Sequence, residues 1–198
     1  SLSQSLLPRA TARFLSTRPN VSVFVQSLPS RQVADLVATR QFDVGLIELP
    51  MARPSISIEP LEPARSVAVI PAGHRLAAKK QISVKDLAGE RMVLLSQHSF
   101  LRYQIDDAFS KADVVPHVVM ETPHSLIACG FAAAGAGITL VSHWAAESFA
   151  GPNVVVRPVR EEMSSRSAVI FPYPGARMQL AEAFAKDLKE EIRLTRKR

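Results

Sequence analysis

Short apolar runs alternate with amphipathic stretches along the chain, and this alternation limits the possible folds more than any other feature. Residues 21–25 and 43–47 have the β-branched and apolar content of short strands. Between them, Val33, Leu36 and Val37 fall on one face of a helix. A strand, a helix and a strand at this spacing form a parallel crossover unit. The pattern therefore predicts an α/β fold.

The same alternation predicts the remaining elements. Further strands are expected at residues 66–70, 91–95, 115–120, 138–141, 153–159 and 167–171. Helices are expected at residues 6–14, 99–109, 123–134 and 176–192, and after Ser30, which is a suitable N-cap. Gly135 and Gly137 permit a tight turn from helix to strand. The last helix is expected to bury Met178, Leu180, Ala181, Phe184, Leu188 and Ile192.

Two proline-rich junctions, residues 60–65 and 172–174, bracket a central block of strand–helix units. They suggest that the chain crosses into a second lobe and returns, with the cleft between the lobes. The expected division is lobe I at 1–64, lobe II at 65–171 and a return to lobe I at 172–198. Each lobe is expected to hold a mostly parallel sheet flanked by helices. Ordinary surface loops explain the prolines equally well.

Composition excludes several classes of protein. The chain has 198 residues, enough for two small lobes, and no apolar run approaches the ~18 residues that span a bilayer. Cys129 is the only cysteine, so an internal disulfide is impossible, and the five histidines lack metal-site spacing. The net charge is +6, but the last six residues carry four of the positive charges. We therefore expect no metal, no cofactor, no membrane and no nucleic-acid contact by these residues.

Several segments resemble one known family in the order in which that family has them. They are Leu6-Leu-Pro8, residues 18–20, the Asp-Val-Gly-Leu-Ile run at 43–47, the Val-Ile-Pro-Ala-Gly-His-Arg-Leu-Ala run at 69–77, Asp-Leu-Ala-Gly at 86–89 and Ala-Gly-Ala-Gly-Ile at 134–138. Together they resemble the effector-binding domain of LysR-type transcriptional regulators, over essentially the whole chain.

This resemblance implies a two-lobed, type II periplasmic-binding-protein-like fold that binds a small-molecule effector in the cytoplasm. It also implies homodimers and tetramers, with DNA bound only through an N-terminal helix-turn-helix that is absent here. The first strand of lobe I is expected before Ser1. Residues 28–30, 87–92 and 122–125 look most like regulators of opine catabolism, which implies an opine or a related arginine-derived amino acid as effector.

In doubly wound sheets, ligands bind beyond the carboxyl ends of strands, where helix N-termini present N–H groups and a partial positive charge to carboxylates. Four such places can be identified, and the resemblance puts effector contacts on the matching loops. The expected contacts are Ser1, Leu2, Pro29, Ser30, Glu48, Ser96, Ser99, Phe100, Arg102, Thr122, Pro123, His124, Val141 and Ser142.

Each candidate also has an ordinary structural explanation. Ser30 and Ser99 are good N-caps with or without a ligand. Glu48 either pairs with an ammonium or guanidinium group or is a solvated strand end. Arg102 either holds a carboxylate through two hydrogen bonds or lies on the surface. His124 either contacts the ligand or only caps and packs.

No set of residues has the spacing of a catalytic centre, so we expect no catalytic residues and no enzyme. The leading hypothesis is a ligand-responsive regulator of transcription. An extracytoplasmic solute-binding protein of the same two-lobed fold remains the alternative, because fold alone does not separate the two. Upstream sequence would separate them: a helix-turn-helix favours regulation, and a signal peptide favours transport.

Overall fold

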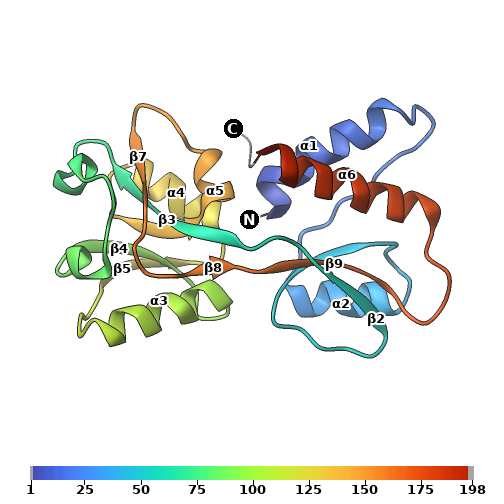
Figure 1. The fold of residues 1–198 in the computed structure, drawn as a ribbon, viewed down its shortest axis with the longest axis horizontal. Coiled ribbons are helices and arrows are strands. Elements are labelled where there is room, and N and C mark those ends of the chain that lie inside the picture. Colours follow the sequence, from blue (N-terminus) through green and yellow to red (C-terminus); the bar gives the residue numbers. More distant parts are fainter. Residues whose placement is uncertain (1, 196–198) are drawn as a thin grey trace. The chain divides into compact units, whose positions relative to one another are not determined.

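The computed structural model describes residues 2–195, with side chains from Leu6 onward, and it has the expected α/β fold. The chain divides into two compact units, traced in Figure 1. The central unit is the continuous segment 64–165, and the terminal unit combines residues 2–63 with the chain from Arg166 onward. Among the described helices, none is both long and apolar enough to cross a bilayer.

The observed division differs from the expected one at the second crossing. We expected the chain to return after residue 171, but it returns between Ser165 and Arg166. The strand that follows, β9 (Ser167–Pro172), pairs along its length with strands of the terminal unit. Pairing in the sheet, and not the prolines at 172–174, therefore decides where the unit begins.

The terminal unit is a small sheet with helices on both faces. Its elements are α1 (Leu2–Ser16), α2 (Ser30–Ala38), β1 (Gly45–Glu48), β2 (Ile56–Pro60), β9 and α6 (Gln179–Thr195). The sheet order is β1-β9-β2. Ala168 and Ile170 of β9 pack with α2, while Phe171, which points to the opposite face, lines a cavity together with α6. Helix α1 lies against α6, away from α2 (Figure 1).

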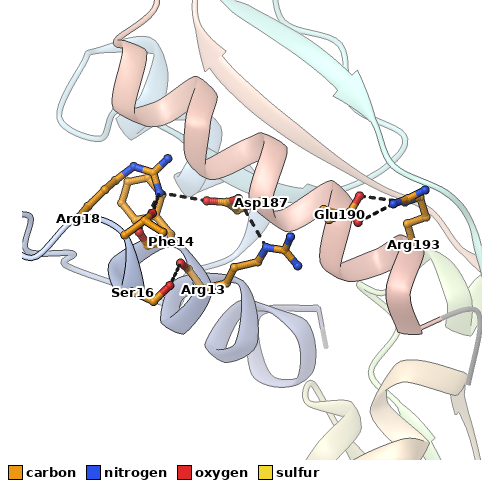
Figure 2. A network of polar contacts seen from close by, with 8 residues as sticks. Arg13, Phe14, Ser16, Arg18, Asp187, Glu190 and Arg193 are labelled. Carbon is orange, nitrogen blue, oxygen red and sulfur yellow. Dashed lines mark hydrogen bonds and ion pairs between the residues drawn. The ribbon is translucent and has the colours of Figure 1, made fainter.

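The seam between α1 and α6 combines aromatic and ionic contacts, and Figure 2 shows the ionic ones. Phe14 meets Phe184 edge to face, with ring centroids 5.5 Å apart. Arg18 donates to the carboxylate of Asp187 at 3.3 Å and to the carbonyl of Phe14 at 2.8 Å. Arg193, the first charge of the basic terminal segment, pairs with a glutamate of its own helix. Met178 and Leu180 are 52% and 42% exposed, contrary to expectation, whereas Ala181, Phe184, Leu188 and Ile192 are buried as predicted.

The expected strand at 21–25 does not form, since residues 21–29 have no regular secondary structure. Val23, Phe24 and Val25 are 37%, 77% and 53% exposed. A strand requires a partner for its backbone groups, and no described segment pairs with this one. The prediction of a strand at 21–25 is therefore wrong for the part of the chain that the structure describes.

Ser30 does not cap α2 as expected. The N-cap is Pro29, and Ser30 is the first helical residue. Its hydroxyl instead accepts a hydrogen bond from the backbone amide of Glu48 at 3.0 Å, which ties the start of α2 to the end of β1.

The central unit holds the larger core. Its strands are β3 (Ala64–Pro71), β4 (Arg91–Leu95), β5 (His117–Thr122), β6 (Thr139–Ser142), β7 (Val154–Pro158) and β8 (Ser164–Ser165). Its helices are α3 (Phe100–Lys111), α4 (Ser125–Ala133) and the short α5 (His143–Glu147), with 3-10 turns at Arg75–Ala78 and Val84–Leu87. Helix α5 was not predicted, because its five residues are too few to show a period.

One strand of reversed direction lies inside each sheet. In the central unit β3 is antiparallel to both β6 and β7, whereas β4 and β5 pair in parallel and a parallel bridge joins Met92 to Ile138. In the terminal unit β9 is antiparallel to β1 and β2. Most paired strands are therefore antiparallel, in contrast to the expected mostly parallel sheets. The two strands on either side of β3, and the two on either side of β9, run in the same direction as each other.

The turn from α4 to β6 forms as predicted. Gly135 has φ +82, a conformation that glycine adopts without strain. At Gly137 a Cβ atom would lie 2.5 Å from the carbonyl oxygen of Arg91, so only glycine lets the chain pass β4 this closely.

Candidate functional site

Two helices of the central unit begin at the carboxyl ends of neighbouring parallel strands. Strand β4 leads through residues 96–99 into α3, and β5 leads through 123–124 into α4. The amide of Ser96 donates to the carbonyl oxygen of Thr122 at 2.9 Å, so the two connections are joined directly. The structure therefore brings six of the predicted contacts into one place: Ser96, Ser99, Phe100, Thr122, Pro123 and His124.

The N-termini of α3 and α4 are not capped by side chains. Ser99 and His124 are the N-cap residues, and neither side chain makes a capping hydrogen bond to its own helix. The first amides of a helix have no partner within the helix, and they carry the positive end of its dipole. Two such ends on adjacent strands are suited to a carboxylate.

The side chains around these ends are partly fixed. Thr122 is 5% exposed, and its hydroxyl accepts from the amide of His124 at 3.4 Å. Phe100 stacks on Tyr103, with ring centroids 6.4 Å apart. Pro123 and His124 are exposed, so the rim of this site is open to solvent.

Arg102 differs most from its expected setting. It is 6% exposed, although it lies only one turn into α3. Its Nε donates to both carboxylate oxygens of Asp106, at 2.8 and 3.0 Å, and its Nη1 donates to the carbonyl oxygen of Leu95 at 2.6 Å and to Glu121 at 2.5 Å. Burial alone would lower the pKa of Arg102, but hydrogen bonds to Asp106 and Glu121 raise it overall, so the guanidinium stays charged.

Val141 and Ser142 end β6, as predicted, and both are buried. The hydroxyl of Ser142 accepts from the amide of Ala145 at 3.4 Å and so caps α5. Its cross-strand neighbour Ser66 has a buried hydroxyl without a hydrogen-bond partner.

The other predicted contacts lie in the terminal unit. Pro29 and Ser30 begin α2, Glu48 ends β1, and the Ser30–Glu48 hydrogen bond brings these positions together. Leu2 begins α1, and Ser1 lies outside the described residues. The terminal unit also has an apolar groove of about 430 Å³. It is lined by α1, residues 21–28, α2, residues 41–46 and the start of α6.

The partners of Arg102 were not predicted from the sequence. Asp106 was detectable, since i and i+4 lie on one face of a helix. Glu121 was not, because its contact depends on the register between β4 and β5, which shifts between Met92 and Val93. Cys129 is fully buried in the core of the central unit, and burial raises the pKa of its thiol to about 12.

Two α/β units, each with a reversed strand inside its sheet and joined by two crossings of the chain, define the class of two-lobed, type II periplasmic-binding-protein-like receptors. The family model described as "LysR substrate binding domain" matches residues 1–193. The chain belongs to this family, as its motifs indicated.

Curated relatives from two organisms agree with this assignment. The chain is 29% identical over 180 residues to the regulatory protein NocR of Agrobacterium tumefaciens (strain T37), covering 91% of this chain and 60% of NocR. It is 27% identical to the octopine catabolism/uptake operon regulatory protein OccR of Rhizobium meliloti, covering 94% of this chain and 61% of OccR. The chain thus spans about three fifths of the length of these relatives. Because they are regulators, the comparisons do not favour a solute-binding protein.

A solved structure supports the fold. The effector-binding domain of BenM with its effector benzoate superposes with a TM-score of 0.81 at 19% identity, covering 98% of this chain and 89% of that one.

Proposed function

We propose that this chain is the effector-sensing and oligomerisation domain of a cytoplasmic LysR-type transcriptional regulator, and that its effector is a small carboxylated metabolite. One observation carries the proposal. Helices α3 and α4 follow two adjacent parallel strands, and the N-cap residue of neither helix makes a side-chain capping hydrogen bond. The first amides of both helices have no partner within the helix and carry a partial positive charge, which suits a carboxylate.

We propose an opine or an arginine-related amino acid as this carboxylated effector. OccR is, by its name, the regulatory protein of an octopine catabolism/uptake operon, and such molecules carry carboxylates that suit the helix N-termini of the central unit. We propose that binding shifts the balance between conformations of homodimers and tetramers, and that the DNA-binding part of the intact regulator responds to this shift.

The test is calorimetric titration of the intact regulator with octopine and L-arginine, with benzoate and shikimate for comparison. Octopine or L-arginine should bind most tightly. Tight binding of benzoate or shikimate alone would refute the opine assignment, and no binding by any of the four would count against the carboxylate site.

Substitutions at the two N-caps test the site itself. Ser99→Asp and His124→Asp place a negative charge where the ligand carboxylate is proposed to bind. Each should weaken binding by roughly tenfold to a hundredfold through charge repulsion. The melting temperature should hold or rise, since aspartate is a good N-cap. Gln179→Asp adds the same charge to the first turn of α6 and should leave affinity unchanged. If Ser99→Asp and His124→Asp bind the effector as tightly as Gln179→Asp does, the proposed site is wrong.

A further inference from the structure

We propose that Arg102 is a positioning residue for the effector site: its guanidinium holds the connections that lead into α3 and α4 in place and does not contact the ligand. This inference rests on the proposed function. Its basis is that one buried guanidinium bonds to three segments, namely the end of β4, the end of β5 and α3 itself.

The contacts of Arg102 enclose both connections. Leu95 is the last residue of β4, and Arg102 lies in the first turn of α3. The hydrogen bond between them therefore joins the two ends of the connection 96–99. Glu121 directly precedes Thr122, whose carbonyl oxygen accepts from the amide of Ser96. The path from Arg102 through Leu95, Ser96, Thr122 and Glu121 back to Arg102 is therefore a closed ring of covalent and hydrogen bonds.

The same contacts argue against Arg102 as a direct ligand. Nε is shared between the two oxygens of Asp106, and Nη1 is engaged by Leu95 and Glu121. A ligand carboxylate could reach Nε or Nη1 only by displacing these acceptors, at a residue that is only 6% exposed. The side chains of Asp106 and Glu121 are 44% and 43% exposed, so water solvates the outer side of each carboxylate while the guanidinium stays covered.

Lysine is the informative replacement at this position. Arg102→Lys keeps the charge, but a single ammonium group lacks the planar set of donors that reaches three acceptors at once. Amide hydrogen exchange in residues 96–99 and 122–125 should become faster, and octopine should bind roughly tenfold more weakly, since charge-assisted hydrogen bonds that fix the site are lost.

Arg157→Lys is the matched control. Arg157 lies in the same unit, and its guanidinium donates to the carbonyl oxygens of Ala77, at 2.8 Å, and Lys79, not to the effector loops. Its replacement should speed exchange near residues 77–79 and leave octopine affinity unchanged. If Arg102→Lys gives the same exchange pattern as this control, or faster loop exchange with unchanged affinity, the proposal is wrong.

Glu121→Gln separates positioning from direct contact by the sign of its effect. If Arg102 bound the ligand, loss of the competing carboxylate would free the guanidinium and strengthen octopine binding. The positioning role predicts weaker binding, because β5 loses its ionic link to α3. Tighter binding would therefore overturn the proposal.

If the wild-type protein binds none of the four probes, the proposed function fails. Amide exchange at residues 96–99 and 122–125 in Arg102→Lys still decides whether Arg102 holds the two connections.

Discussion

Asp86 stabilises the 3-10 turn Val84–Leu87 through a capping box with Ser83. Its carboxylate accepts from the amide of Ser83 at 2.9 Å and is paired with Lys79. The hydrogen bond from Lys79, followed by that from the Ser83 backbone, lowers the pKa of Asp86 to about 2. The charged form of Asp86 is therefore the form that favours the folded state.

This shift gives a stability prediction with a definite sign. A lowered pKa in the folded state contributes stability above the unfolded value of 3.8, and this contribution disappears as the pH falls towards 2. Asp86→Asn should therefore lower the free energy of unfolding at pH 7, and its deficit should shrink between about pH 4 and pH 2. Denaturant titrations of both proteins at pH 7, 4 and 2.5 measure this difference. A deficit that does not change with pH would assign the effect to the lost geometry and not to the charge.

Predictions from neighbouring residues alone succeeded for the glycine turn at Gly135 and failed for the N-cap of α2, where the hydroxyl of Ser30 accepts from the amide of Glu48 instead. The burial of Arg102 does not follow from neighbouring residues, because it depends on two carboxylates, one of which is 19 residues away along the chain. Pairing between separate strands is not visible in the periodicity of either strand.

At the scale of elements, residues 21–25 have strand-like content without a strand. The apolar groove beside them is lined by α1, by these residues and by the segment that enters β1. Helices α1 and α2 lie on opposite faces of the sheet. Successive right-handed crossovers place their helices on opposite faces only when the strand order reverses. A strand that led into α1 would therefore lie between residues 21–25 and β1.

We therefore predict that residues 21–25 pair with an extended segment that precedes Ser1 in the intact regulator, as the resemblance implied. Amide exchange at 21–25 should be slow in a protein extended at its N-terminus and fast in residues 1–198 alone. Exchange at β2, which pairs with β9 on the far side of the sheet, should be similar in both and serves as the internal control. Equally fast exchange at 21–25 in both proteins would refute the pairing.

At the scale of the whole molecule, the two units differ in continuity. The central unit is one segment, 64–165, with its own extensive core, whereas the terminal unit needs both ends of the chain. We predict that residues 64–165 fold alone. Trp144, the only tryptophan, is 3% exposed in this unit and reports its packing by fluorescence. A cooperative denaturant transition with a blue-shifted native emission is expected, and a broad transition with solvent-like emission would contradict it.

The order of elements predicted the α/β class, because each apolar run had enough local content to be recognised. The limits of the units were harder to predict, since they depend on which sheet β9 joins. Prolines mark places where a chain turns, and they carry no information about the sheet that the following strand enters.

The central position of β9 also determines when the terminal unit can fold during protein synthesis. Glu48 of β1 pairs with Ser167 of β9, so the ribosome delivers the middle strand of this sheet roughly 120 residues after its neighbour. Until β9 emerges, β1 and β2 have no strand between them, whereas every residue of the central unit, 64–165, leaves the ribosome before β9 does. The newly made receptor should therefore acquire its central unit first and close its terminal sheet last.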